Sequence, residues 1–179
     1  MIVGHLGVAA AVAAARPRIS PWWVIPAAVA PDLLDIAFAL AGVCNPYGLY
    51  SHTVPAALLL GAVLGGAALL TAGRDTGAAV ASLALLHLPP DLLTGRKLYW
   101  PGGELHGLRL YDRPILDFTT EVLLLVAGWA LLRGRSRWPA WMTSVRTLAC
   151  FILLQGALDG FVTRSLKPTG CVAAGQSGP

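Results

Sequence analysis

Ionisable side chains occur in pairs within segments of the chain that are otherwise apolar. The members of each pair are three or four residues apart, and the pairs are Asp32 with Asp35, His87 with Asp91, and Asp117 with Glu121. Residues at this spacing share one face of a helix, so each pair presents two ligand atoms to one point. Ionisable residues at membrane depth are costly and normally face a bundle interior, where they mark a functional site. The spacing therefore predicts a polar site that several helices build together.

A metal centre is the chemistry that this residue set favours. Several carboxylates at one point raise one another's pKa values unless a cation offsets their charge. Histidine and carboxylate donors without a converging thiolate suit Zn²⁺, Mn²⁺ or Fe²⁺, whereas oxygen donors alone suit Mg²⁺ or Ca²⁺. More than four donors implies two or more ions, an arrangement that activates water in phosphoryl chemistry. We predict a divalent metal, Zn²⁺ first, with Mg²⁺ or Mn²⁺ as alternatives.

The composition places these residues in a membrane protein. Of the 179 residues, 56% are hydrophobic and 12% are charged, and the mean hydropathy is +0.66. A soluble domain has about 25% charged residues, and one of this size could not bury so much apolar surface. The net charge of +4 fits basic residues at loop ends and lipid headgroups. We expect membrane lipid as a partner and no nucleic acid.

Six apolar segments are candidate membrane-spanning helices, because a span needs about 20 mostly apolar residues. They cover residues 2–15, 22–43, 53–72, 77–94, 114–132 and 141–163. The sequence predicts an all-α, polytopic transmembrane bundle of five to six helices, with the metal site in one half of the bundle. It also predicts one membrane-embedded domain over residues 1–166 and a disordered tail over residues 167–179.

Proline and glycine give local signals within these segments. Pro89 and Pro90 predict a broken helix between His87 and Asp91, because proline lacks the N–H that continues a helix. A broken helix at membrane depth is tolerated where it lines a cavity. Small residues that allow close helix contact occur in the third segment, at Gly61, Gly65 and Gly66.

The alternation of six spans places the ionisable residues in the same half of the bundle. His5 begins the first span, His52 immediately precedes the third, and Asp159 lies near the end of the sixth. Random placement of polar groups would rarely give this result, so we expect a single shared site. For Asp159, structural pairing with Arg164 or Arg146 is the preferred interpretation.

The longest connection, residues 95–113, is rich in glycine, aromatic and charged residues, which is typical of the rim of a site. Because guanidinium and ammonium groups bind phosphate, we predict that an anionic headgroup binds at Arg96, Lys97, Arg109 and Arg113. His106, in the same loop, is a candidate acid or accessory ligand. Asp32 is the candidate general base.

An ordered set of motifs extends over residues 1–132. The set comprises GH (4–5), PDLLD (31–35), SHT (51–53), HLPPDLLTG (87–95), LYWP (98–101) and DFTTE (117–121). In this order the motifs resemble the YdjM/YbcI-like inner-membrane metal-dependent hydrolases. The HxxxD pair and the later pair that ends in Glu121 are similar, more remotely, to the ligand pattern of zinc-dependent phospholipase C. The resemblance implies a helical hydrolase of the bacterial-type cytoplasmic membrane that acts on phosphoesters. It also implies metal ligands at His5, Asp35, His52, His87, Asp91, Asp117 and Glu121.

We therefore expect a metal-dependent hydrolase that cleaves a phosphoester or diphosphate of a lipid-like substrate with metal-activated water. Two alternatives use the same residues. In a Mg²⁺-dependent prenyl-diphosphate cyclase, synthase or transferase, the acidic pairs would hold Mg²⁺ against the diphosphate. In a proton- or metal-coupled transporter, intramembrane carboxylates and broken helices are also expected.

Overall fold

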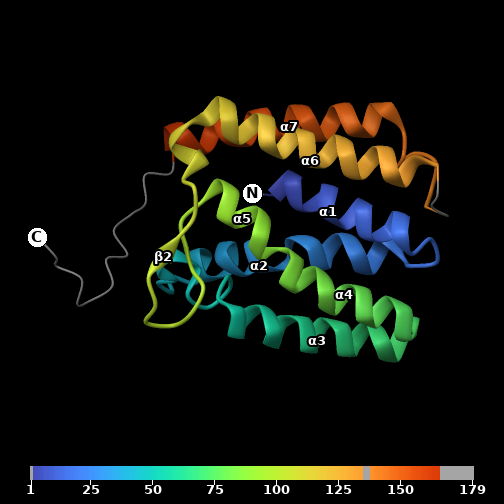
Figure 1. Cartoon of the computed structure of the whole chain (residues 1–179), viewed down its shortest axis with the longest axis horizontal. Coiled ribbons are helices and arrows are strands. Elements are labelled where there is room, and N and C mark those ends of the chain that lie inside the picture. The colour runs from blue at the N-terminus through green and yellow to red at the C-terminus, as the bar shows by residue number, and fades with distance from the viewer. Residues whose placement is uncertain (1, 135–137, 166–179) are drawn as a thin grey trace, which may run out of the picture.

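Helices that run side by side make up the bundle (Figure 1). The computed structural model describes residues 2–134 and 138–165, with side chains as far as residue 159. In chain order the helices are α1 (Ile2–Ala15), α2 (Pro21–Leu40), α3 (Val54–Ala72), α4 (Arg74–Leu86), α5 (Leu88–Thr94), α6 (Pro114–Arg133) and α7 (Val145–Ser165). The predicted all-α bundle is confirmed. The predicted tail, residues 167–179, lies outside the described residues.

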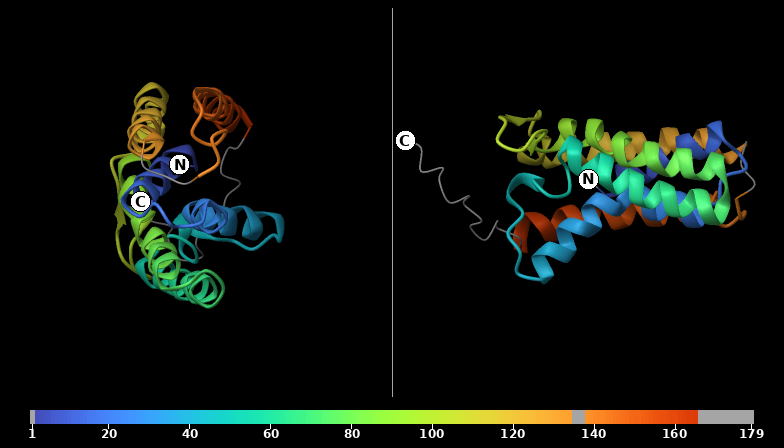
Figure 2. Two further views of the ribbon diagram at one scale, coloured as in Figure 1. Left: turned by 90° about the vertical axis from the view of Figure 1, so that its right-hand side faces the viewer. Right: turned by 90° about the horizontal axis from the view of Figure 1, so that it is seen from below.

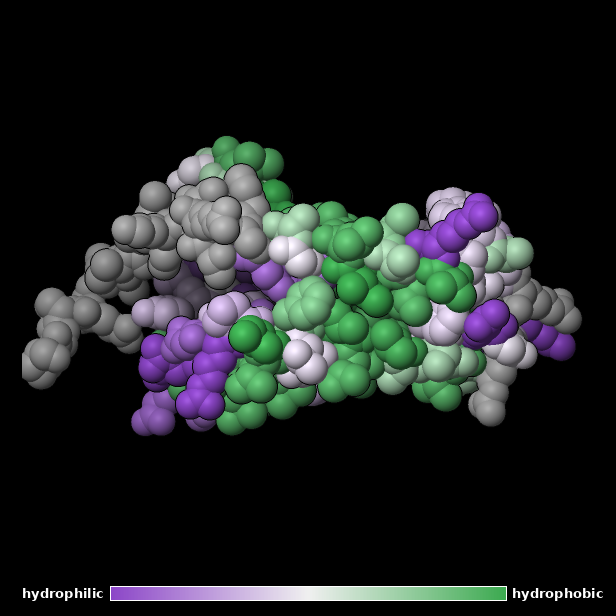
Figure 3. Space-filling view, turned by 90° about the horizontal axis from the view of Figure 1, so that it is seen from above, coloured by the Kyte–Doolittle hydropathy of each residue, from purple (hydrophilic) through white to green (hydrophobic). Residues whose placement is uncertain are grey.

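Four helical segments are long and apolar enough to cross a membrane, and they are Pro21–Leu40, Val54–Ala72, Arg74–Thr94 and Pro114–Arg133. α1 is apolar but has only 14 residues. α7 begins at Val145 rather than near residue 141, because the preceding residues form a turn in which the Met142 N–H donates to the Pro139 carbonyl (2.9 Å). On the face shown in Figure 3, apolar side chains cover the middle of the bundle and hydrophilic side chains lie at both ends. The chain is thus built as an integral membrane protein.

Glycine contacts hold the helices in two close pairs. α1 lies at the centre of the bundle, with α6 and α7 on one side and α3 and α4 on the other (Figure 2). A Cβ built on Gly128 of α6 would lie 1.9 Å from the Gly7 carbonyl oxygen of α1, so these two backbones touch. Gly61 and Gly65 give the same close contact between α3 and α4, as predicted, whereas a Cβ on Gly66 would meet nothing within 4 Å. Close backbone contact of this kind is how small residues join membrane helices.

The predicted break in the fourth span occurs at His87. α4 ends at Leu86 and α5 begins at Leu88, and the two following prolines supply no N–H to the helix ladder. The His87 carbonyl accepts a hydrogen bond from His5 Nε2 of α1 (3.0 Å). This hydrogen bond links α1, at the centre of the bundle, to the break between α4 and α5.

The 95–113 connection folds over the end of the bundle where the ionisable residues gather. Its short elements are the antiparallel strands β1 (Lys97–Leu98) and β2 (Leu105–His106) and the 3₁₀ turn η2 (Leu110–Asp112). The Val54 N–H, at the start of α3, donates to the Tyr99 carbonyl (2.8 Å), and the Leu108 N–H donates to the Leu92 carbonyl of α5 (2.8 Å). These backbone bonds fix the loop against α3 and α5.

Candidate metal centre

Four side chains converge beside the helix break, and we call them the His/Asp group. They come from α2, from the residue before α3, from the α4–α5 break and from α5, and they are Asp32, His52, His87 and Asp91. One ligand atom of each lies within 4.8 Å of the ligand atoms of the other three. His52, His87 and Asp91 are fully buried, whereas the Asp32 side chain is 13% exposed. Asp32 is therefore the member that solvent or substrate reaches most easily.

The facing atoms of the His/Asp group form a compact set. Asp91 Oδ2 lies 2.9 Å from His52 Nε2 and 3.3 Å from His87 Nε2. Asp32 Oδ1 lies 3.4 Å and 3.6 Å from the same two nitrogens. The two nitrogens themselves are 3.2 Å apart. Two imidazole nitrogens and two carboxylate oxygens thus surround one point.

Hydrogen bonds hold the outer nitrogen of each of these two imidazoles. His87 Nδ1 donates to the Ala28 carbonyl of α2 (2.9 Å), because a carbonyl can only accept. His52 Nδ1 lies 2.7 Å from Ser51 Oγ and 3.4 Å from Asp35 Oδ2. Such outer contacts fix the tautomer and orientation of metal-binding histidines. In the neutral rings with Nδ1 protonated, both Nε2 atoms would offer lone pairs to a metal at the centre of the group.

A tight turn before α3 positions His52. Thr53 is the N-cap of α3, and its Oγ1 accepts from the Ala56 N–H (3.3 Å). The His52 N–H donates to the Gly48 carbonyl (2.7 Å). Gly48 has φ +76°, and a Cβ there would lie 2.8 Å from the His52 Cβ, so the turn requires glycine. His52 is consequently held just outside the helix with its side chain pointing into the bundle.

Asp35, an expected ligand, lies on the outer side of His52 instead of within the His/Asp group. It accepts hydrogen bonds from Ser51 Oγ and from Asn45 Nδ2 (2.5 Å), and Lys97 Nζ lies 3.5 Å from it. Three residues along α2 move a side chain about 4.5 Å along the helix axis, which brings Asp35 nearer the loops than Asp32. Asp32, expected as a general base, lies among the candidate ligands.

His5, another expected ligand, packs against the His/Asp group without belonging to it. Its ring stacks on that of His87 with centroids 3.5 Å apart and planes 5° apart. His5 Nε2 donates to the His87 carbonyl and lies 3.5 Å from Asp91 Oδ1, while His5 Nδ1 lies 3.6 Å from Asp32 Oδ2. His5 therefore faces the second oxygen of each carboxylate, the one turned away from the other two histidines.

Negative charge shifts the pKa of the basic groups that lie outside the membrane-spanning helices. Burial by itself lowers the pKa of His52, but its hydrogen bonds to the surrounding carboxylates, Asp32 first, raise the pKa to about 10. Burial also lowers the pKa of Lys97, whereas the Asp91 and Asp35 carboxylates raise it above its usual value. Both shifts reflect a surplus of negative charge at the site, which a divalent cation would offset.

A second set of acidic side chains, which we call the acidic group, lies between α6 and α7. Its members, whose ligand atoms lie within 4.8 Å of one another, are Asp117, Glu121 and Asp159. Glu121 Oε2 accepts from the Gly4 N–H of α1 (3.3 Å), and Gln155 Nε2 donates to Asp159 Oδ1 (2.6 Å). Among the described residues, Asp117 Oδ1 is buried without a hydrogen-bond partner. The acidic group thus consists of oxygen donors alone.

The single shared site that was expected is therefore divided into two groups. α6 and α7 pack on the opposite side of α1 from α3 and α4 (Figure 2), so Asp117 and Glu121 meet Asp159 instead of His87. Asp159 was expected to have a structural role with Arg146 or Arg164, and the structure places it in the acidic group. The side chain of Arg164 lies outside the described residues.

The loop cations differ in their relation to the site. Lys97 is the one of the four expected headgroup ligands that forms a described ion pair with a site carboxylate, that of Asp35 (3.5 Å). Arg109 pairs with Asp112 (3.0 Å) at the surface, and the remaining two, Arg96 and Arg113, are exposed. His106 is also exposed, on β2 opposite Lys97, with its ring 5.4 Å from that of Tyr99. In the part of the chain that the structure describes, His106 belongs to neither group.

Sequence reasoning gave Tyr99, Asn45 and Gln155 no role in the site. The Tyr99 hydroxyl is buried without a hydrogen-bond partner among the described residues, and the nearby Asp91 carboxylate adds to burial in raising its pKa. Asn45 holds Asp35 and Ser51, and Gln155 holds Asp159. The polar Gln155, one turn before Asp159 in an apolar segment, is a signal that could have been used. Asn45 lies in a polar loop, where an asparagine gives no such signal.

The chain matches no family model, no curated protein and no solved structure. What the geometry itself supports is a buried His/Asp group that could hold a divalent metal within a membrane-spanning bundle. The oxygen-only acidic group could hold a second, harder cation.

Proposed function

We propose that this protein is a metal-dependent hydrolase of the cytoplasmic (inner) membrane that cleaves a phosphoester or diphosphate of a lipid-like substrate. The observation that carries the proposal is the geometry of the His/Asp group. Four donors around a metal at about 2.0–2.1 Å, the zinc–nitrogen and zinc–oxygen distances, form a tetrahedron with edges of about 3.3 Å. The five measured donor separations run from 2.9 to 3.6 Å. They fit a single ion held by two imidazoles and two carboxylates.

The unequal exposure of the four donors favours catalysis over a purely structural metal. Structural zinc sites have four protein ligands, whereas catalytic sites keep three and leave a position for water or substrate. His52, His87 and Asp91 are fully buried, and Asp32, at 13% exposed, is the least buried of the four donors. In our proposal the first three residues would hold the metal, and the Asp32 carboxylate, the least buried of the four, would accept a proton from the attacking water.

The metal, when bound, supplies Lewis acidity and lowers the pKa of water at the open position. The residues of the chain supply orientation and charge. Ser51 and Asp35 orient His52, and the Ala28 carbonyl orients His87. Lys97, whose raised pKa keeps it cationic, is the group placed to attract the anionic phosphate. A second ion at the acidic group would neutralise carboxylates that are costly to bury together.

Metal analysis and turnover of the same preparations test this proposal. We expect purified protein to contain bound divalent metal and to release phosphate from a lipid phosphate. His87→Ala should lose both, because it removes a buried donor. Asp75→Asn, which changes an exposed carboxylate at the start of α4, is the matched control and should lose neither. Full metal content and full turnover in His87→Ala would contradict the proposal.

Product analysis separates this function from the alternatives. Incubation with a polyprenyl diphosphate should give phosphate and an intact alcohol. A rearranged or transferred hydrocarbon would identify a prenyl-diphosphate enzyme instead. Metal uptake into proteoliposomes without any product would identify a transporter.

A further inference from the structure

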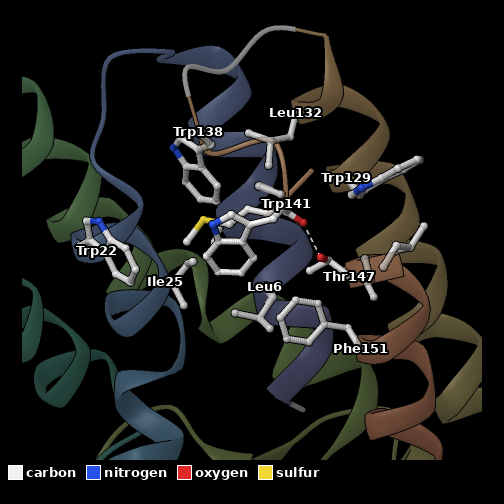
Figure 4. Close-up of a pocket in the computed structure, with 14 residues that line it drawn as sticks. Leu6, Trp22, Ile25, Trp129, Leu132, Trp138, Trp141, Thr147 and Phe151 are labelled. Atoms are coloured by element: carbon white, nitrogen blue, oxygen red, sulfur yellow. Dashed lines mark hydrogen bonds between the residues drawn. The ribbon is translucent and has the colours of Figure 1, made fainter. Parts of the chain in front are cut away.

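An apolar pocket lies directly beside the polar groups, on the opposite side of α1 from α3. It has a volume of about 280 Å³ and is enclosed by α1, α2, α6, α7 and the residues that precede α7. Figure 4 shows Leu6 and Phe151 at one end of the pocket and Leu132 and Trp138 at the other. The pocket therefore extends along the bundle through its membrane-spanning part.

Three helices connect this pocket to the polar groups in the same way. On α6 the pocket residue Leu125 is four positions from Glu121 of the acidic group. On α1 and α7 the pocket residues Ala9 and Phe151 are four positions from His5 and Gln155, which contact His87 and Asp159. Residues at this spacing lie on one face of a helix, about 6 Å apart along its axis. One end of the pocket is consequently one helical turn from Glu121 of the acidic group and from His5, whose ring stacks on His87 of the His/Asp group.

The walls of the pocket are fixed by hydrogen bonds that do not depend on a ligand. Trp138 Nε1 donates to the Ile19 carbonyl and Trp129 Nε1 donates to the Thr143 carbonyl, both at 3.1 Å. Buried indoles usually find such a partner, and here the bonds leave the ring faces to line the cavity. Ligand pockets are commonly preformed and apolar in this way, with volumes of about 300–1,000 Å³.

Two tryptophans form an opening toward the bilayer. Trp22 is 70% exposed and Trp141 is 60% exposed, and both also line the pocket. Both indoles lie at the outer surface of the bundle, so a hydrocarbon chain can enter the pocket from the side. The small volume favours one hydrocarbon chain over the two chains of a diacyl lipid.

We propose that this pocket binds the hydrocarbon chain of the substrate, and that the substrate is a phosphate ester of a single-chain lipid alcohol. The phosphate lies at the metal-binding groups, and the first part of the chain lies between α1, α6 and α7. The assignment of a phosphate as the headgroup of the substrate rests on the proposed function. The chain position rests on the pocket alone.

Photo-crosslinking locates the chain independently of turnover. The probe is a single-chain alkyl phosphate with a diazirine in its chain, used on the full-length protein in lipid nanodiscs. We expect cross-links to concentrate on pocket residues such as Phe151, Met142 and Trp138, and competition by the same phosphate without the diazirine. Cross-links spread over lipid-facing residues such as Leu59 and Leu70, or gathered in the groove at Leu60 and Leu64, would overturn the proposal.

A matched pair of substitutions on α7 provides a second test. Leu148→Trp fills the pocket, whereas Leu153→Trp makes the same change at a side chain that is 73% exposed. Loss of contact with about two methylene groups should raise KM for a long-chain phosphate roughly tenfold, with kcat and the hydrolysis of a short-chain ester unchanged. Equal effects of the two substitutions would overturn the proposal. Pocket cross-links without hydrolysis would refute the proposed function and leave the chain-binding pocket in place.

Discussion

In each imidazole of the His/Asp group, Nε2 faces the candidate ligand atoms and Nδ1 contacts residues outside the group. His87 is held by a backbone carbonyl, which mutation cannot remove, whereas His52 is held by the side chains of Ser51 and Asp35. The orientation of His52 is therefore the part of the site that can be altered without touching a ligand.

Ser51→Ala and Asp35→Asn should weaken metal binding without abolishing it. Loss of an outer partner of a metal-binding histidine typically costs about 10–100-fold in affinity. Competition with a chromophoric chelator measures the change. Ser82→Ala, which removes an exposed hydroxyl bonded within α4, is the control. Unchanged affinity in both variants would show that Ser51 and Asp35 do not act through His52.

Asp32→Asn should separate metal binding from turnover. Because three buried donors remain, we expect the variant to retain metal while phosphate release falls by about 10²–10⁴-fold, the usual contribution of a general base. Metal analysis and turnover are measured on the same sample. If Asp32→Asn loses metal in proportion to activity, Asp32 is a ligand only.

At the scale of helices, the close pair formed by α1 and α6 brings His5 and the Gly4 N–H to their places. A side chain at Gly7 or Gly128 would overlap the backbone of the partner helix. By contrast, nothing would obstruct a side chain at Gly66. A methyl group is therefore excluded at Gly7 and Gly128, where the helices touch, but fits at Gly66.

Gly128→Ala should destabilise the bundle by about 1–3 kcal/mol or more, as overpacking does. Gly66→Ala should be neutral or stabilising by up to about 1 kcal/mol, because alanine favours a helix over glycine. Thermal unfolding in detergent, followed by circular dichroism, measures both. A larger loss of stability in Gly66→Ala than in Gly128→Ala would contradict the packing described here.

Helical periodicity and proline chemistry predicted much of this arrangement. The i, i+4 spacing of His87 and Asp91 is a local property that the structure confirms. The predicted break is local too, and the structure places it at His87, just before the turn of α5 that contains Pro89 and Pro90. The division into two groups depends on which helices pack together, and α1 packs with α6 across more than a hundred residues of chain. Local spacing contains no information on such a pairing.

At the scale of the whole molecule, the His/Asp group joins segments that are far apart in the chain. A ligand that binds only the folded state stabilises it by about 2.7 kcal/mol at a concentration one hundred times its Kd. The members of the His/Asp group come from α2, the turn before α3, the α4–α5 break and α5. Metal should therefore act as a cross-link between these elements.

Addition of Zn²⁺ or Mn²⁺ to chelator-treated protein should raise its thermal midpoint in a concentration-dependent manner. Chelator should reverse the effect, because the metal binds the folded state alone. His87→Ala, which lacks a buried donor, should show no such increase. An equal increase in His87→Ala would place the stabilising metal elsewhere.

The pairing of α1 with α6 also has a consequence for biosynthesis. The His/Asp group is complete once residues 32–91 have been inserted, whereas the acidic group needs residues as late as Asp159. Chains fold progressively from the N-terminal side as they are synthesised. α2 to α5 can therefore assemble around their four donors early, while the glycine face of α1 has no partner until α6 leaves the ribosome and enters the bilayer.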